Sequence, residues 1–167
     1  MLIEMSVARL AVDPFTNTPI VVLKDEAGKN AVPIWIGLLE ASAIAMELEK
    51  VEMARPMTHD LMKTMLAKTG VEVARVEVSG LRDNTYYATI CLRHGGREIA
   101  IDARPSDALA LALRTGARIC VDESIVEKAR HLDLRGRTEV CDPELDEDAY
   151  RDFLASLADE PTAKWKM

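Results

Sequence analysis

Residues 101–114, IDARPSDALALALR, begin with the pattern of a strand and continue as alternating alanine and leucine. We interpret the second part as a helix, because Ala and Leu are strong helix formers, no residue of the Ala-Leu run is β-branched, and Pro105 with Ser106 and Asp107 is typical of a helix start. At helical spacing Leu109 and Leu113 share one face, and Leu111 lies nearly opposite. One sheet covers only one face of such a helix, so we expect a second protomer to cover another and predict a homo-oligomer.

The same order of elements occurs in the first half of the chain. VPIWIGLLEASAIA (32–45) aligns without gaps with IAIDARPSDALALA (99–112), and the tripeptide VAR at 7–9 returns at 73–75. Both aligned segments begin as strands and become alanine-rich helices. We therefore predict an internal duplication of a βββα(β)α unit.

Each half contains apolar, strand-like runs separated by turn-forming residues. The predicted strands cover 2–12, 19–24, 31–36, 71–78, 85–92, 97–102 and 118–121, with helices over 38–49 and from residues 58 and 105 onward. This pattern predicts an α+β fold in which a mixed β-sheet packs with helices. Pro33 lies inside one predicted strand and cannot donate to a sheet ladder, so that strand is expected at a sheet edge or near its own end.

The composition is that of one globular domain followed by an acidic segment. The chain has 167 residues, of which 49% are hydrophobic, enough for one buried core. We assign residues 1–135 to the domain and 136–167 to an acidic linker with a short C-terminal helix, in which apolar residues recur at helical spacing. The formal net charge of −7 argues against a broad basic surface for nucleic acid.

Cysteine usage and the N-terminus bear on location. MLIEMSVARL (1–10) carries an acidic residue where a signal peptide needs an uninterrupted apolar run, and no stretch of the sequence is long enough to span a bilayer. Cys91, Cys120 and Cys141 are odd in number and lack paired metal-ligand spacing, which favours reduced, buried thiols. We expect a cytoplasmic protein with no membrane contact and no organic cofactor.

Two stretches share a design at the start of a helix. RPMTHDLM (55–62) and RPSDALAL (104–111) each place Arg-Pro before a hydroxyl residue and an aspartate. Arg55 and Arg104 are candidate phosphate ligands, because guanidinium pairs with phosphate in a bidentate fork and the N–H groups of a helix start attract anions. The alternative is that each arginine neutralises the adjacent aspartate.

The hydroxyl and acidic residues of these stretches also have two interpretations. Thr58 and Ser106 are either phosphate ligands or helix N-caps. Strand geometry sends Asp102 to the same side as Arg104, with Asp107 one helical turn beyond. Two such carboxylates can hold Mg²⁺ or Mn²⁺, which neutralises a phosphate and activates water. The alternative is an ion-pair network of these carboxylates with Arg104 and Arg114.

Three further residues are candidates at the helix starts. His59 is a general base, a metal ligand or an ordinary first-turn histidine, and Asp60 beside it is a candidate catalytic carboxylate. Glu40 aligns with Asp107 in the two halves and lies in an otherwise apolar helix. This placement predicts an ion pair between Glu40 and a buried arginine.

The strings VPIWIGLLEASAIAMELE, YYATICL, RPMTHDLM and IDARPSDALALALR together resemble the bacterial bifunctional nuclease domain family, and the resemblance covers about residues 3–132. It implies a compact, oligomeric α+β domain with activity on RNA and DNA. The resemblance implies that the site residues lie in these motifs, which makes eight positions candidates: Arg55, Thr58, His59, Asp60, Asp102, Arg104, Ser106 and Asp107.

We therefore predict a nuclease that hydrolyses RNA or DNA phosphodiester bonds with metal assistance. Asp102 and Asp107 are its predicted metal ligands, Arg55 and Arg104 bind phosphate, and His59 moves a proton. The acidic balance and an aromatic content of only 4% favour short or single-stranded substrates. The alternative is a non-catalytic, oligomeric regulatory module that binds a phosphate-bearing ligand or a protein partner.

Overall fold

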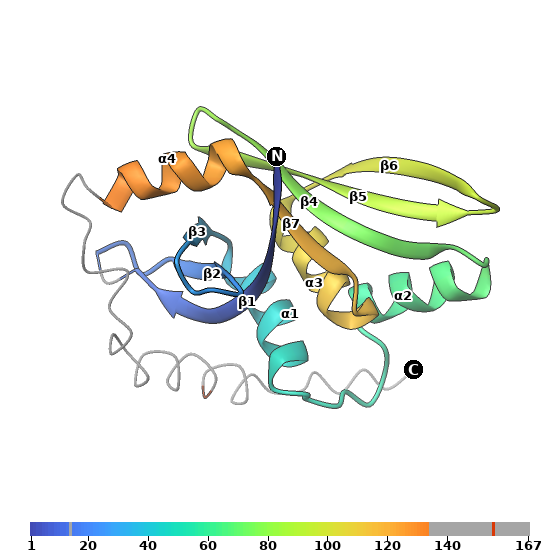
Figure 1. Ribbon diagram of the computed structural model, residues 1–167. Helices are drawn as coiled ribbons and strands as arrows, with labels where there is room; N and C mark the ends of the chain where they lie inside the picture. Colours follow the sequence, from blue (N-terminus) through green and yellow to red (C-terminus); the bar gives the residue numbers. More distant parts are fainter. Residues whose placement is uncertain (14, 134–154, 156–167) are drawn as a thin grey trace.

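The computed structural model describes residues 1–13, 15–133 and 155 (Figure 1). The elements in this part are β1 (Leu2–Val12), β2 (Pro19–Asp25), β3 (Ala31–Trp35), α1 (Leu38–Leu48), α2 (Thr58–Lys68), β4 (Glu72–Arg82), β5 (Thr85–His94), β6 (Arg97–Ala103), α3 (Pro105–Thr115), β7 (Arg118–Asp122) and α4 (Glu123–Asp133). The strands and helices predicted for this part of the chain are all present. The predicted acidic linker and C-terminal helix (136–167) lie outside the described residues, apart from Ala155.

A seven-stranded mixed sheet runs through the molecule in the order β3-β2-β1-β7-β4-β5-β6. Strands β1 to β3 form one antiparallel meander, and β4 to β6 form another. Strand β7 joins the two, because it pairs antiparallel with β1 and parallel with β4. The predicted α+β class is confirmed, and Pro33 lies in the edge strand β3.

The two halves of the chain have similar local features. In β1 the pairing register shifts between Val7 and Arg9, and in β4 it shifts between Val73 and Arg75, so both VAR tripeptides sit at an irregularity. A bulge of this kind bends a strand and increases its twist. Two meanders of one topology can share such features without common origin, so the internal duplication stays a prediction.

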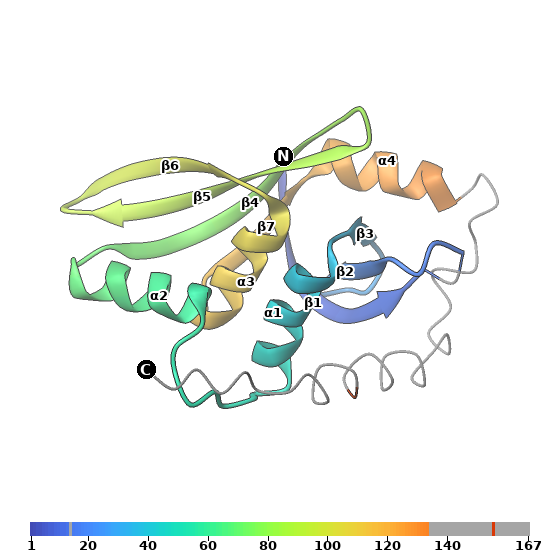
Figure 2. The ribbon, with the colours of Figure 1, turned by 180° about the vertical axis from the view of Figure 1, so that it is seen from behind.

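Helix α3 lies at the centre of the fold, with α1 and α2 on either side of it (Figure 2). It also packs on β4, β5 and β7, and Leu109 and Leu111 on its opposite faces are both buried. The broad apolar surface of α3 is therefore covered within one chain. The expectation that a second protomer must cover this helix is wrong, because the helices and the sheet together surround it; the homo-oligomer itself stays a prediction.

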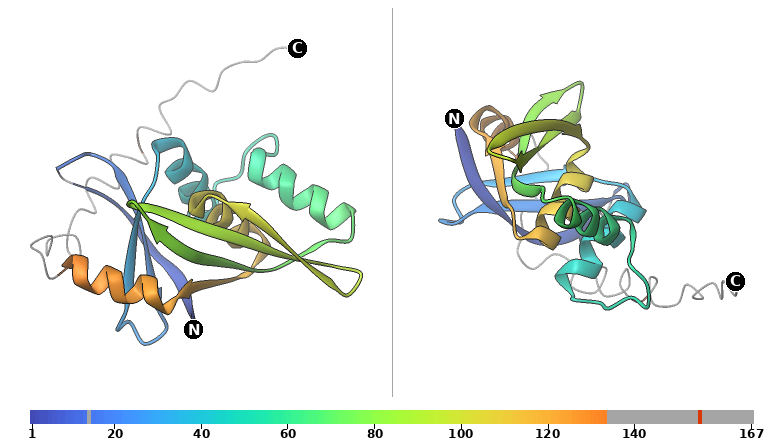
Figure 3. Two further views of the ribbon diagram at one scale, coloured as in Figure 1. Left: turned by 90° about the horizontal axis from the view of Figure 1, so that it is seen from above. Right: turned by 90° about the vertical axis from the view of Figure 1, so that its right-hand side faces the viewer.

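The sheet curls so that its two halves approach each other. Strand β3 is first in the sheet order and β5 is sixth, yet the hydroxyl of Tyr86 in β5 donates a hydrogen bond of 3.0 Å to the carbonyl oxygen of Pro33 in β3. Burial raises the pKa of Tyr86 to about 12, so this donor keeps its proton. Figure 3 shows the long β4–β6 strands turned across β1–β3. The curl places the end of β3 next to the β4–β5 turn.

Two other expectations concern the thiols and the helices. Cys91 and Cys120 are free and buried, and burial raises the pKa of both thiols, so they are inert packing residues as predicted. Cys141 lies outside the described residues.

Among the helices that the structure describes, none is both long and apolar enough to cross a lipid bilayer.

Candidate functional site

The starts of α2 and α3 supply most of the predicted site residues. The N-cap of α2 is Met57 and that of α3 is Arg104, and no side-chain cap hydrogen bond forms at either. The prediction that Thr58 and Ser106 are N-caps is therefore wrong, since both are already helical. In α3 the reason is Pro105, whose fixed φ suits the first helical position and moves the N-cap back to the arginine.

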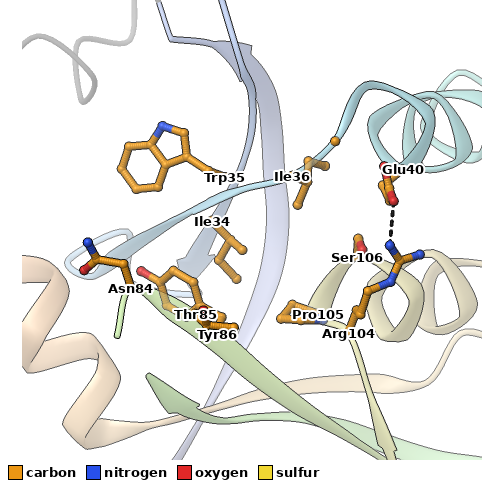
Figure 4. A pocket seen from close by; sticks show the side chains of 11 residues that line it. Ile34, Trp35, Ile36, Glu40, Asn84, Thr85, Tyr86, Arg104, Pro105 and Ser106 are labelled. Carbon is orange, nitrogen blue, oxygen red and sulfur yellow. Dashed lines mark hydrogen bonds and ion pairs between the residues drawn. The ribbon is translucent and has the colours of Figure 1, made fainter. Parts of the chain in front are cut away.

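A continuous chain of polar contacts joins the starts of the three helices. His59 Nε2 lies 3.2 Å from Asp107 Oδ1. Arg104 donates to both oxygens of Asp107, from Nε to Oδ2 at 2.7 Å and from Nη2 to Oδ1 at 3.2 Å. Its Nη1 donates to Glu40 Oε1 at 2.7 Å (Figure 4). We call these four residues the Arg104 network.

The Arg104 network joins the two carboxylates that align between the halves of the sequence. Glu40 and Asp107 bind the same guanidinium, so the predicted arginine partner of Glu40 is present. That arginine is not buried as expected, because the Arg104 side chain is 65% exposed. Of the two interpretations given to Asp107, the ion-pair network is the one seen among the described residues.

The buried arginine of this region is Arg114, whose side chain is 4% exposed. Its Nε donates to Asp60 Oδ1 at 2.6 Å, and its Nη1 donates to the carbonyl oxygens of Ala43 and Ala110 at 3.0 Å each. These contacts connect α1, α2 and α3. They hold the first turn of α2, and with it His59, against α3.

Both carboxylates at the helix starts are held in the charged form. Burial raises the pKa of Asp107, but hydrogen bonds from Arg104 and His59 outweigh this effect and leave the pKa below its usual value. Burial likewise raises the pKa of Asp60, and the hydrogen bonds from Arg114 and from a backbone N–H lower it by more. Asp60 and Asp107 are therefore carboxylates at neutral pH, each hydrogen-bonded to an arginine.

Asp102 lies apart from the Arg104 network. It is exposed on β6 opposite Thr89, and its side chain makes no hydrogen bond or ion pair with the residues that the structure describes. Its neighbour Ile101 pairs with the buried Ile90, so strand alternation turns Asp102 to the other face of the sheet. No contact brings Asp102 and Asp107 together.

The fit of a metal ion to these residues can be judged from the donor groups. Within residues 1–13 and 15–133 no group of three or more His, Cys, Asp or Glu side chains is placed to hold a metal. Both oxygens of Asp107 already accept N–H groups from Arg104. The described residues do not form the oxygen-rich ligand set that Mg²⁺ takes. Metal binding by Asp102 and Asp107 stays a prediction, and we derive no step through a metal.

The predicted phosphate ligands of the first helix start lie on the surface. Arg55 and Thr58 are exposed, and neither makes a hydrogen bond or ion pair with any described residue. They precede His59 directly in the chain. The structure therefore leaves both side chains free for a ligand but does not join them to the Arg104 network.

A pocket of about 290 Å³ opens beside Arg104 (Figure 4). It is lined from three places: the end of β3 with the start of α1, the β4–β5 turn, and the start of α3. Sequence reasoning identified Arg104 and Ser106 but missed Ile36 and Tyr86 as lining residues. No local pattern marks those two, because only the curl of the sheet brings their segments together.

Comparison with known proteins places the chain in a family. Residues 21–133 match the bifunctional nuclease domain. The chain is 36% identical over 160 residues to an uncharacterized protein of Mycobacterium tuberculosis strain H37Rv, covering 93% of this chain and 94% of that protein. It is 31% identical to Bifunctional nuclease 1 of Arabidopsis thaliana over 109 residues, which are 63% of this chain and 34% of the plant protein.

Bifunctional nuclease 2 of Oryza sativa subsp. japonica gives a similar result, with 31% identity over 111 residues, 64% of this chain and 34% of the rice protein. The chain thus spans about a third of the length of these plant relatives. The region matched by the family includes both helix starts and all four residues of the Arg104 network. The chain belongs to the bifunctional nuclease domain family, as its motifs predict.

Proposed function

We propose that this protein is a nuclease that cleaves phosphodiester bonds of RNA or DNA. Membership of the family supports the reaction class. The observation that carries the proposal is the contact of His59 with Asp107 next to an exposed arginine. A histidine oriented by a carboxylate and a cation beside it are the groups that proton transfer and phosphate binding need.

In this proposal His59 is the general base. Its Nε2 faces Asp107, so the neutral ring donates its Nε2 proton to that carboxylate and keeps Nδ1 as the acceptor. Nδ1 accepts a proton from the attacking nucleophile, which is either a water molecule or the 2′-hydroxyl group of the ribose. One P–O bond forms, the bond to the leaving oxygen breaks, and solvent protonates that oxygen.

Arg104 is the proposed phosphate ligand. A guanidinium has five N–H donors, and the three contacts with Asp107 and Glu40 leave two of them for a substrate. The nearby Ser106 adds a hydroxyl, and Arg55 and Thr58 contact phosphates farther along the strand. Asp60 acts indirectly, because it holds the first turn of α2 through Arg114.

The charge of the protein bears on the substrate. A chain with a net charge of −7 repels long polyanions, and a large basic surface is needed to bind duplexes tightly. We therefore propose that short or single-stranded RNA or DNA is cleaved.

The test is cleavage of end-labelled, single-stranded RNA and DNA by purified protein, with Arg104→Gln purified identically as the control for contaminating nucleases. We expect the wild type to cut and the variant to cut at least about 100-fold more slowly, since the loss of one charged transition-state contact has this size. Equal cutting by both proteins, or no cutting by either, contradicts the proposal.

Parallel reactions in EDTA, Mg²⁺ and Mn²⁺ test the predicted metal role. If Asp102 and Asp107 bind the ion, EDTA abolishes cleavage and Asp102→Asn raises the metal concentration needed for half-maximal rate. Undiminished cleavage in EDTA contradicts a metal role for these residues. That result leaves the reaction to His59 and Arg104.

A homo-oligomer, which is expected of the nuclease and of the alternative non-catalytic module alike, is supported by exposed apolar side chains of α1 and of α2 with its N-cap: Leu38, Leu39, Met57, Leu61 and Met65. Leu39 is 81% exposed. Large exposed apolar side chains such as these are typical of interfaces between protein chains. We propose that a second copy of the chain covers them.

The oligomer is tested by light scattering during size exclusion. We expect the wild type to exceed the monomer mass of 18.5 kDa, and Leu39→Glu to return the protein to that mass because it buries a charge in the interface. Phe15→Glu is the matched control, since Phe15 is also exposed but lies in the β1–β2 turn. A monomeric wild type overturns the proposal.

A further inference from the structure

We infer that the pocket beside Arg104 binds one unpaired nucleotide, with its phosphate at the start of α3 and its base against the end of β3 and Tyr86. The inference rests on the proposed nuclease function and gives it a substrate subsite. Its evidence is the lining of the pocket, which offers the Arg104 guanidinium and other hydrogen-bond donors at one end, with Glu40 beside them, and is apolar at the other.

The donor end is built around Ser106. This residue is only 6% exposed, it lines the pocket, and its hydroxyl has no hydrogen-bond partner among the described residues. Among the described residues no side-chain polar atom is both buried and unpaired, so the Ser106 hydroxyl reaches the open space of the pocket, where it is available to a ligand. Figure 4 shows Ser106 beside Arg104 and Glu40 at this end of the pocket.

Backbone donors lie at the same end. The first intrahelical bond of α3 runs from Ala108 N–H to the carbonyl oxygen of Arg104 at 3.1 Å, and no side chain caps the helix. The N–H groups of Ser106 and Asp107 therefore remain without helical acceptors. Together with the two remaining N–H donors of Arg104, they can satisfy the oxygens of one phosphate.

The opposite wall is apolar. Ile34 lines it from β3, Ile36 lines it from the segment that follows β3, and Tyr86 lines it with an aromatic ring from β5. The Tyr86 hydroxyl is already bonded to the carbonyl oxygen of Pro33, so the ring has no free donor for the ligand and contributes apolar surface. Glu40, which accepts a hydrogen bond from Arg104 at the donor end, is also an acceptor for a sugar hydroxyl or a base amine. A phosphate joined to an apolar, planar group that carries N–H or O–H donors describes a nucleotide.

The size of the pocket sets the form of the substrate. A volume of about 290 Å³ is at the lower limit for small-ligand sites, which admits one nucleotide and excludes a base pair. A base can enter only if it leaves its stack, and this costs least in a single strand or at a strand end. The subsite thus gives a physical reason for single-strand preference in an acidic protein.

The test measures binding without cleavage. Calorimetry and backbone amide NMR are performed on the full chain with adenosine 5′-monophosphate, adenosine and inorganic phosphate as separate probes. We expect the monophosphate to bind, to shift the Ser106 and Asp107 amides, and to bind at least about 10-fold more tightly than either fragment, since both ends of the pocket then contribute.

Variants locate the site. Thr85 is exposed at the pocket lining, so Thr85→Glu places a negative charge at the pocket without altering the core and is expected to weaken binding about 10-fold or more. Thr64→Glu makes the same charge change on the exposed surface of α2 and is expected to leave binding unchanged. Ser106→Ala, which removes one hydrogen bond, is expected to weaken binding about 5-fold.

The outcomes separate this inference from the nuclease proposal. Binding of the monophosphate by a protein that cleaves nothing supports the pocket and contradicts the nuclease. Cleavage without monophosphate binding, or with Thr85→Glu and Thr64→Glu equally active on single strands, overturns the pocket. Binding of inorganic phosphate as tightly as the monophosphate also overturns it, because the apolar wall then contributes nothing.

Discussion

Replacing His59 with glutamine is expected to lower the rate of phosphodiester cleavage by about 10²–10⁴-fold, the usual contribution of a general base. Glutamine keeps an N–H donor for Asp107 but has no group that accepts a proton at neutral pH. The loss should therefore appear in kcat, with KM little changed, since Arg104 and the pocket remain. Single-turnover cleavage of labelled single strands measures it.

A set of variants distinguishes this role from a structural one. His94→Gln is the matched control, because His94 is exposed and contacts a backbone carbonyl oxygen, that of Gly70, and no residue of the Arg104 network; this variant should cut normally. Asp107→Asn should slow cleavage, and Asp107→Glu should restore part of the rate because it keeps a carboxylate for the ring. A His59→Gln protein that is folded and fully active excludes His59 as the base.

Replacing Asp60 with alanine is expected to lower the free energy of unfolding by about 3 kcal/mol. The change leaves the Arg114 guanidinium, which is 4% exposed, without its counter-charge. Breaking a buried pair from one side typically costs about 3–5 kcal/mol, and we take the lower value because Asp60 itself is 37% exposed and two carbonyl oxygens still accept from Arg114. Urea unfolding at pH 7 measures the difference.

Two further variants test the cause of this loss. Arg114→Met removes the buried charge itself, so the double variant with Asp60→Ala should be more stable than Asp60→Ala alone. Asp122→Ala is the matched control, because Asp122 also accepts the N–H of a helix start, at Ser124, but has no buried arginine; it should cost only about 1 kcal/mol. A double variant no more stable than Asp60→Ala contradicts the buried-charge explanation.

The contribution of Asp60 also depends on pH. Its pKa is lowered in the folded protein, so the stabilisation is fully present above the unfolded pKa of about 4 and is lost as the pH falls through the lower folded value. The stability curves of the wild type and Asp60→Ala should therefore converge below about pH 4. A constant difference between the curves down to pH 2 contradicts this linkage.

The secondary structure follows from local patterns in the sequence. Alternating apolar residues bounded by turn-forming residues locate the strands, and the Ala-Leu run after Pro105 forms a helix although its alternation also fits a strand. Pro33 marks an edge strand, because the absence of its N–H is a property of that residue alone. The predicted N-cap of α3 is wrong because of one residue. Pro105 takes the first helical position, so Arg104 and not Ser106 precedes the helix.

Local patterns also pointed to the residue types of the site but not to their partners. His59 and Asp107, Arg104 and Glu40, and Asp60 and Arg114 are each separated by many residues, and their pairing depends on how α1 and α2 pack beside α3. The side chain of Asp102, which is exposed on β6, contacts none of these residues.

By itself, the sequence determined the elements, the family and the two Arg-Pro helix starts, because short-range periodicity and motif residues encode them directly. Only the tertiary structure decided that α3 is enclosed within one chain, that Arg104 holds two carboxylates, and that a pocket opens beside it. The physical reason is the curl of the sheet. It brings the Tyr86 hydroxyl of β5 to the carbonyl oxygen of Pro33 in β3, and no local pattern in either strand predicts this hydrogen bond.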